Sequence, residues 1–192
     1  MKQKIKKGVF VIGPPGSGKS SVASFLEQRY SLKWVSMGKL LRKVAYNKKD
    51  SRSAAVRKAI ESGKGASDKL ILSIYKDNIK TAKNGVVLDG NPGGVYQAQK
   101  TISLLKENNI KNIFCIRLTC LKKICVKRII ARDSSVRKDG SLSVINKRFA
   151  WYKTKVMEGY KTIKKNSQLT VIVDSSGEIY NTTKKLVTLL AM

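Results

Sequence analysis

A glycine-rich stretch near the start of the chain restricts the fold more than any other feature. Residues 13–20 read Gly-Pro-Pro-Gly-Ser-Gly-Lys-Ser and match every fixed position of the phosphate-loop pattern G-x-x-x-x-G-K-[ST]. The apolar run 8–12 before it predicts a buried strand, and helical spacing follows over 18–30. Glycines let backbone N–H groups approach phosphate oxygens, and a helix N-terminus favours negative charge. The stretch therefore predicts a site for a nucleoside triphosphate.

Each part of this loop has an expected role. Lys19 would reach the β- and γ-phosphates, and the Ser20 hydroxyl would bind Mg²⁺. The residues expected to contact the triphosphate are Gly13, Pro15, Gly16, Ser17, Gly18, Lys19 and Ser20.

An apolar run at 86–88 ends in Asp89 and Gly90. This run predicts a carboxylate at the C-terminal end of a buried strand. Phosphate-loop enzymes hold Mg²⁺ at such a position, directly or through water. Asp89 is therefore a candidate magnesium residue, and the alternative is that it only caps the turn before Gly90.

Composition narrows the class of protein. The 192 residues are 42% hydrophobic and predict one globular domain over 1–192. No apolar run approaches the roughly 20 residues that a membrane helix needs, so we expect a cytoplasmic protein. The chain has no histidine, which excludes histidine-based acid–base and triad chemistry. Its three cysteines match no zinc pattern and predict reduced thiols.

The chain is strongly basic, with 40 Lys and Arg against 12 Asp and Glu and a net charge of +28. Such a field attracts polyanions, including nucleotides, nucleic acid and anionic membranes. The lysines are spread along the chain, which favours a solvated basic surface over a dedicated nucleic-acid site. Non-specific binding of nucleic acid remains an expectation.

Strand-like runs alternate with helical patterns, which is typical of a doubly wound parallel α/β sheet. The expected strands are 8–12, 33–35, 85–88, 112–118 and 169–173. The expected helices are 18–30, 38–46, 53–61, 67–83, 95–107, 121–131, 142–165 and 178–190. The pattern predicts a three-layer α/β/α fold with a five-stranded parallel sheet, like that of P-loop NTPases.

Four arginines cluster in the sequence downstream of the phosphate loop. Arg128 and Arg132 share one face of a predicted helix, Arg137 lies in a short loop at 133–141, and Arg148 lies in the next helix. Guanidinium groups match phosphate geometry and suit a site that neutralises a transferring phosphoryl group. In a chain this basic, the alternative for each is an ordinary surface arginine.

From about residue 7 to about residue 190, the chain resembles the adenylate kinase family of nucleoside monophosphate kinases, in its short-lid form. Residues 36–42 resemble the S-T-G-D-x-L-R motif, 63–68 the G-x-x-V-x-D turn, and 89–97 the D-G-F-P-R-T-x-x-Q motif. Residues 128–132 are similar to R-x-x-x-R and 137–140 to R-x-D-D, and Arg148 matches the arginine of the following helix. The motifs occur in the family's order and at its separations.

The resemblance implies reversible transfer of the γ-phosphoryl group of ATP to AMP, giving two ADP, with Mg²⁺ accompanying ATP. It implies a helical monophosphate-binding insertion at about 36–80 and a short lid at about 133–141. On the ATP side, Ser20 and Asp89 would lie near Mg²⁺ and Arg128 against the ATP base. The implied catalytic residues are Lys19, Arg132, Arg137 and Arg148. The implied AMP-binding residues are Gly38, Arg42, Lys64, Ala66, Gly90 and Gln97.

The acceptor side departs from the family's pattern. Gly93 stands where the family has an arginine for the AMP phosphate, Lys39 replaces an acidic residue, and Met37 replaces a threonine. In the lid motif, Gly140 replaces the second aspartate. The ATP side matches, so we expect a weakened acceptor site whose phosphate rests mainly on Arg42.

Several expectations remain open at this point. Lys39 and Lys100 are the nearest lysines that could assist Arg42. Gln97 favours AMP over a pyrimidine monophosphate, because an amide can pair with the adenine edge. The alternatives are a kinase for another nucleoside monophosphate, including a pyrimidine one, and a non-catalytic nucleotide- or RNA-binding member of the fold. We expect a monomer.

Overall fold

A five-stranded parallel sheet forms the centre of the molecule, as the sequence predicts. We describe residues 6–61, 66–90, 92–131 and 141–190 of a computed structural model. The strand order is β2-β3-β1-β4-β5, and every neighbouring pair is parallel. The strands run Lys7–Ile12 (β1), Lys33–Ser36 (β2), Gly85–Asp89 (β3), Asn112–Thr119 (β4) and Leu169–Asp174 (β5).

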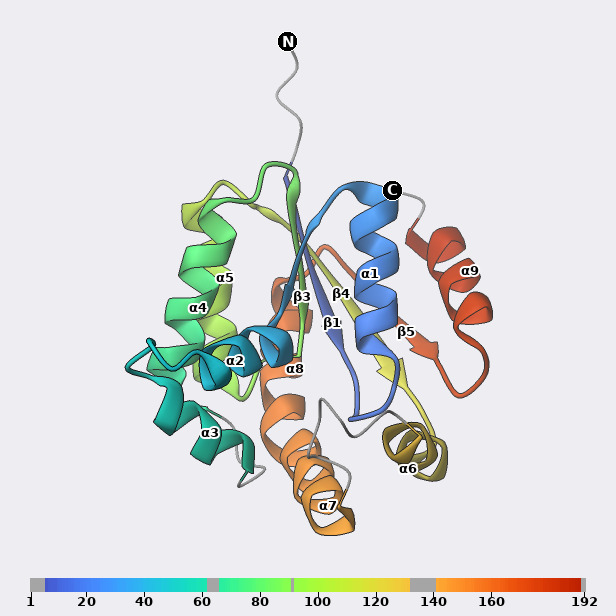
Figure 1. The fold of residues 1–192 in the computed structure, drawn as a ribbon. Helices are drawn as coiled ribbons and strands as arrows, with labels where there is room; N and C mark the ends of the chain where they lie inside the picture. The colour runs from blue at the N-terminus through green and yellow to red at the C-terminus, as the bar shows by residue number, and fades with distance from the viewer. Residues whose placement is uncertain (1–5, 62–65, 91, 132–140, 191–192) are drawn as a thin grey trace.

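Helices cover both faces of the sheet (Figure 1). α1 (Lys19–Tyr30) and α9 (Ile179–Leu190) lie on one face, and α4 (Asp68–Lys80), α5 (Val95–Glu107) and α8 (Met157–Asn166) lie on the other. Alternation along β1 supplies both cores, because successive side chains of a strand point to opposite faces. Val9 and Val11 belong to the α1 side, whereas Phe10 and Ile12 belong to the α4–α5 side. Burial on both faces explains why β1 is apolar from Val9 to Ile12.

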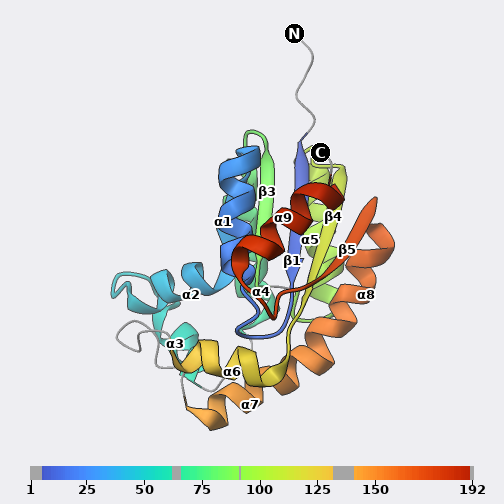
Figure 2. The same cartoon turned by 90° about the vertical axis from the view of Figure 1, so that its right-hand side faces the viewer.

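The remaining helices gather at the end of the sheet opposite the N-terminus (Figures 1 and 2). They are α2 (Met37–Tyr46), α3 (Ser53–Glu61), α6 (Lys122–Ile130) and α7 (Leu142–Trp151). The segment expected to bind a monophosphate, 36–80, thus contains α2, α3 and α4. Of the expected lid, 133–141, only Ser141 lies within the described residues.

The helix predicted as one element over 142–165 is interrupted. A π-helical turn, η1 (Tyr152–Val156), separates α7 from α8. The Thr154 hydroxyl donates to the carbonyls of Ala150 (3.0 Å) and Trp151 (3.5 Å) within this turn. Such side-chain bonds to preceding carbonyls compete with the backbone hydrogen bonds of the helix, and the spacing of apolar residues does not reveal them.

Within the described residues, no helix has both the length and the apolar character needed to cross a bilayer.

Candidate active site

The carboxyl ends of the central strands open into one pocket of about 730 Å³. Ligands of open parallel sheets bind at this edge, because the loops that follow the strands converge there. Every described residue expected from sequence to bind ATP, AMP or metal lines this pocket: Gly13, Pro15, Gly16, Ser17, Gly18, Lys19, Ser20, Gly38, Arg42, Ala66, Asp89, Gly90, Gln97, Arg128 and Arg148. Lys64, Arg132 and Arg137 lie outside the described residues.

The phosphate loop joins β1 to α1 through two glycines with left-handed backbone. Gly16 has φ +82° and Gly18 has φ +84°, a backbone region that residues other than glycine rarely adopt. A Cβ on Gly16 would lie 2.4 Å from the carbonyl oxygen of Cys125 in α6. A Cβ on Gly18 would meet nothing within 4 Å. The loop is therefore packed against the α6 backbone at Gly16 and open at Gly18.

Lys19 is held over this loop. Its Nζ donates hydrogen bonds to the carbonyl oxygens of Gly13 (2.9 Å) and Pro14 (2.8 Å). Because Lys19 is also the first residue of α1, the ammonium group lies at a helix N-terminus, whose first turn has no acidic residue. Positive charge at a helix N-terminus suits a bound phosphate.

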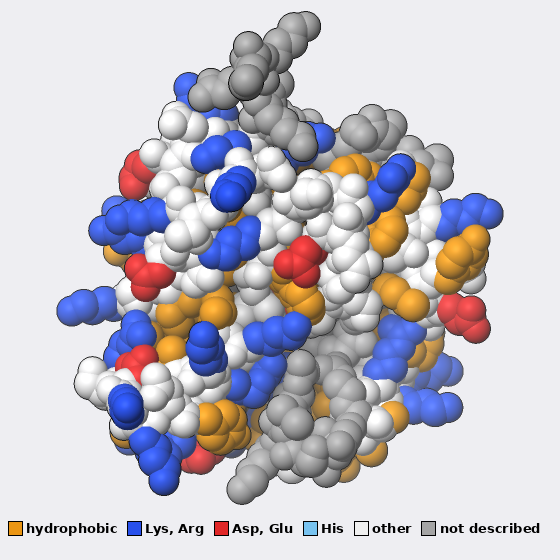
Figure 3. All heavy atoms as spheres, turned by 45° about the horizontal axis from the view of Figure 1, so that its top comes forward, with side chains coloured by type: hydrophobic (Ala, Val, Ile, Leu, Met, Phe, Trp, Pro, Cys, Tyr) orange, Lys and Arg blue, Asp and Glu red, His pale blue; other side chains and the backbone are white. Residues whose placement is uncertain are grey.

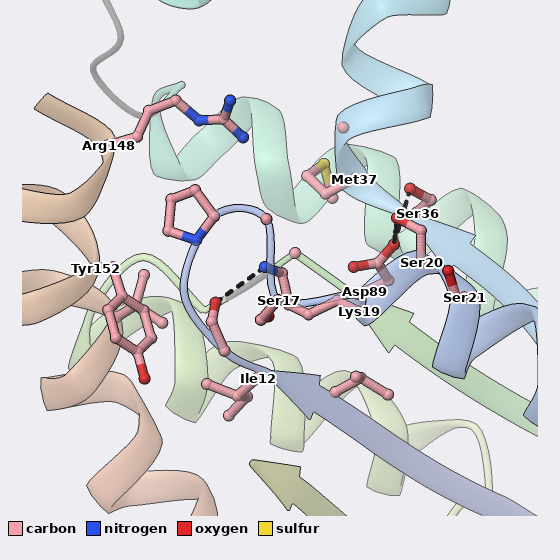
Figure 4. A pocket seen from close by; sticks show the side chains of 18 of the residues that line it. Ile12, Ser17, Lys19, Ser20, Ser21, Ser36, Met37, Asp89, Arg148 and Tyr152 are labelled. Atoms are coloured by element: carbon pink, nitrogen blue, oxygen red, sulfur yellow. Dashed lines mark hydrogen bonds between the residues drawn. The ribbon is translucent and has the colours of Figure 1, made fainter. Parts of the chain in front are cut away.

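Two hydroxyls meet one buried carboxylate beside the loop (Figure 4). Asp89 is 4% exposed, and its Oδ2 accepts from the Ser20 hydroxyl at 2.8 Å and from the Ser36 hydroxyl at 3.3 Å. Ser36 begins the 36–42 motif but was not expected from sequence to contact Asp89. It ends β2 directly opposite Asp89 in the β2–β3 register, so strand pairing is the signal that could have found it.

These oxygens fit a hard cation such as Mg²⁺, which prefers carboxylate and hydroxyl oxygen, water and phosphate. Among the described residues, no group of three or more His, Cys, Asp or Glu could hold a metal by itself. A magnesium ion here would therefore depend on Ser20, Asp89, water and the phosphates of a nucleotide.

Arg128 connects α6 to the loop that follows β5. Its guanidinium donates to the carbonyls of Ser175 (2.8 Å), Ser176 (3.2 Å) and Gly177 (2.6 Å). Ser175 and Gly177 line the pocket, together with Glu178, Ile179 and Thr182. Sequence reasoning missed this segment, although β5 ends at the same edge as the other strands. The pocket thus extends from the phosphate loop to the start of α9.

Cys120 and Cys125 lie near Arg128 but do not line the pocket. Cys125 is buried in α6, and burial raises the pKa of its thiol, with the neighbouring Cys120 thiol adding to the rise. Its thiol is therefore protonated near neutral pH. The described structure contains free thiols at all three positions, as the sequence predicts.

On the opposite side of the pocket, an amide is fixed between two elements. Gln97 of α5 is 3% exposed, and its Nε2 donates to Oδ1 of Asp68 at the start of α4 (2.7 Å). The backbone N–H of Gly93 donates to Oε1 of Gln97 (2.8 Å). The Arg42 guanidinium lies close to the Gly38 backbone in α2. A Cβ on Gly38 would be 3.4 Å from Nη1 of Arg42. Gln97 and Arg42 thus share the cavity on the α2–α5 side.

The lysines expected to assist Arg42 lie elsewhere. Lys39 has its Nζ 3.5 Å from the Trp34 ring centroid, and Lys100 has its Nζ 5.8 Å from the Tyr96 ring centroid. Neither lysine lines the pocket, whereas Arg148 does. Figure 4 shows Arg148 pointing from α7 toward the pocket. The described cationic side chains for a second phosphate are therefore arginines.

On the face shown in Figure 3, basic side chains do not form a single band. Figure 3 shows Lys and Arg scattered over the visible face, separated by other side chains. Acidic side chains appear between them on the same face. This distribution agrees with the interpretation of a solvated basic surface.

Comparisons with known proteins place the chain in a family. The adenylate kinase family model matches residues 11–167. An adenylate kinase of Leptospira biflexa is 29% identical over 79% of this chain and 82% of its own length. An adenylate kinase of Wigglesworthia glossinidia brevipalpis is 32% identical over 65% of this chain. A GTP:AMP phosphotransferase of Plasmodium falciparum is 31% identical over 63% of this chain.

The last two matches span about half of those relatives, 55% and 54% of their lengths. The family match nevertheless covers most of this chain, including the whole phosphate loop at 13–20, Asp89, Gln97 and Arg148. The chain belongs to the adenylate kinase family.

Proposed function

We propose that the protein is a Mg²⁺-dependent nucleoside monophosphate kinase that transfers the γ-phosphoryl group of ATP to AMP, giving two ADP. One observation carries this proposal: Lys19, the Ser20–Asp89 pair and the Gln97 amide line a single pocket. The relatives named adenylate kinase and GTP:AMP phosphotransferase support the same class of reaction. A monomeric, cytoplasmic enzyme is part of the proposal and rests on the sequence alone.

Charge neutralisation and positioning would perform most of the catalysis. Phosphoryl transfer requires little covalent chemistry from the protein, so no general base is needed. Lys19 and Arg148 reach the pocket from two different elements and would neutralise the transferring group from two sides. Mg²⁺ would be held near Ser20 and Asp89 and would neutralise charge on the ATP phosphates. Arg132 and Arg137 remain predicted catalytic residues.

The two ends of the pocket suit two nucleotides. Arg128 and the loop 175–177 would hold the base of the triphosphate, since they lie beside the phosphate loop. The α2–α5 side would take the monophosphate, with Arg42 on its phosphate and Gln97 on its base.

The test removes the lysine of the phosphate loop. Lys19→Ala should lower ADP formation from ATP and AMP by at least about 10²-fold, the scale for loss of one preorganised electrostatic contact. Lys43→Ala, which removes an exposed lysine of α2 outside the pocket, is the matched control. Coupled ADP assays and circular dichroism would be run on both variants.

The acceptor is identified by the same assay with AMP, CMP, UMP and GMP. Preference for AMP would support the proposal, and preference for CMP or UMP would move the acceptor to a pyrimidine. A folded Lys19→Ala protein with unchanged turnover would contradict the role of Lys19. A wild-type protein that forms no ADP with any monophosphate would favour a non-catalytic nucleotide-binding module.

A further inference from the structure

The amide of Gln97 is oriented before any nucleotide arrives. An amide has two N–H donors on nitrogen and two acceptor lone pairs on oxygen. Asp68 accepts from Nε2 at 2.7 Å, and the Gly93 N–H donates to Oε1 at 2.8 Å. With these two partners among the described residues, one N–H and one lone pair remain for a ligand in the pocket that Gln97 lines.

Both partners oppose rotation of the amide. If the amide turned over, its oxygen would face the Asp68 carboxylate, and its NH₂ group would face the Gly93 N–H. Each hydrogen bond would become a repulsive contact at a side chain that is 3% exposed, where water cannot compensate. A charged acceptor such as Asp68 forms the stronger of the two bonds.

Close packing at Gly93 reinforces this arrangement. A Cβ on Gly93 would lie 3.1 Å from both amide atoms of Gln97 and 3.1 Å from Cζ2 of Trp151. The absence of a side chain at this position lets the Gly93 backbone approach the amide oxygen. Gly93 thus helps to hold Gln97 in place. This role differs from that of the arginine in the family pattern, which binds the AMP phosphate.

An oriented amide can distinguish two classes of purine. Adenine presents a donor at N6 beside an acceptor at N1, whereas hypoxanthine and guanine present an acceptor at O6 beside a donor at N1. Only one of these orders matches a given orientation of the amide. A ligand whose phosphate and ribose are already placed cannot reverse its base to compensate.

We propose that Asp68, together with the backbone N–H of Gly93, locks the Gln97 amide and sets the preference for a 6-aminopurine over a 6-oxopurine monophosphate. This inference rests on the proposed function. Asp68 does not line the pocket, so it is a positioning residue that acts through Gln97. The two hydrogen bonds that fix the amide join α5 to the start of α4 and to the segment before α5.

The test compares AMP with inosine monophosphate (IMP), which differs from AMP only at the purine 6-position and the N1 proton. Asp68→Ala should raise the KM for AMP by about 10-fold or more and lower the AMP-to-IMP ratio of kcat/KM by a similar factor. The kcat with AMP and the KM for ATP should change little. Asp68→Asn retains an acceptor oxygen and should recover most of the AMP affinity.

Asp77→Ala is the matched control, because it removes an exposed aspartate from the same helix. Shifts in melting temperature with AMP and IMP report binding independently of turnover. Unchanged AMP and IMP constants in Asp68→Ala would overturn the proposal. So would an Asp68→Asn protein that behaves like Asp68→Ala, because the role would then be charge at the start of α4. A wild-type protein without AMP turnover that still distinguishes AMP from IMP in melting shifts would refute only the kinase activity.

Discussion

Replacing the glycines of the phosphate loop one at a time separates backbone strain from packing. Gly16 and Gly18 have nearly the same φ, +82° and +84°, but different surroundings. A Cβ on Gly16 would lie 2.4 Å from the Cys125 carbonyl oxygen and 2.9 Å from the Cys125 Cα, whereas a Cβ on Gly18 meets nothing within 4 Å. Gly16→Ala and Gly18→Ala therefore share the cost of a left-handed backbone, but only Gly16→Ala adds a steric clash with α6.

The shared cost is the left-handed backbone, which costs a residue with a side chain about 1–2 kcal/mol. Gly16→Ala adds overpacking against the α6 backbone, typically about 1–3 kcal/mol. The expected losses in free energy of unfolding are thus about 2–5 kcal/mol for Gly16→Ala and about 1–2 kcal/mol for Gly18→Ala. For a domain of this size, 1 kcal/mol lowers the melting temperature by about 2–4 °C.

Urea unfolding followed by circular dichroism measures both variants without nucleotide. Gly177→Ala is the baseline control, since a Cβ there meets nothing within 4 Å and its backbone is outside the left-handed region. It should leave stability within about 0.5 kcal/mol of wild type. Equal destabilisation by Gly16→Ala and Gly18→Ala would refute the inference that the loop packs against α6.

Two further predictions concern the three cysteines and Arg128. Burial raises the pKa of Cys115 to about 12, so its thiolate fraction at pH 8 is on the order of 10⁻⁴, and Cys125 is also buried. Iodoacetamide should therefore modify only the half-buried Cys120 of the folded protein, and mass spectrometry showing native modification of Cys115 would contradict this. Arg128→Ala removes the hydrogen bonds to 175–177 and should raise the KM for ATP by about 10-fold or more while leaving the KM for AMP unchanged. Arg128→Lys should not restore it, because a compact ammonium group lacks the planar fork of donors that reaches all three carbonyls. Equal effects on both nucleotides would argue against a separate ATP side.

Local patterns were enough to predict most of the architecture. Buried strands such as β1 are continuous apolar runs, and the phosphate loop has fixed glycine positions, so both can be identified without tertiary information. Each predicted strand differs from the observed strand by one residue at an end. The π-helical turn at 152–156 escaped prediction, because apolar spacing continues through it and does not report a change in backbone hydrogen bonding.

Tertiary structure determined how the residues around the pocket pair with one another. Ser36 meets Asp89 because β2 and β3 align in register, and Arg128 meets the loop 175–177 because β4 and β5 end side by side. Lys39 faces Trp34 instead of the pocket, which no spacing rule indicates. Motifs specify which chemical groups are present and on which element they lie. The partners of those groups come from parts of the chain that are distant in sequence, so the sheet order and the packing of the helices decide them.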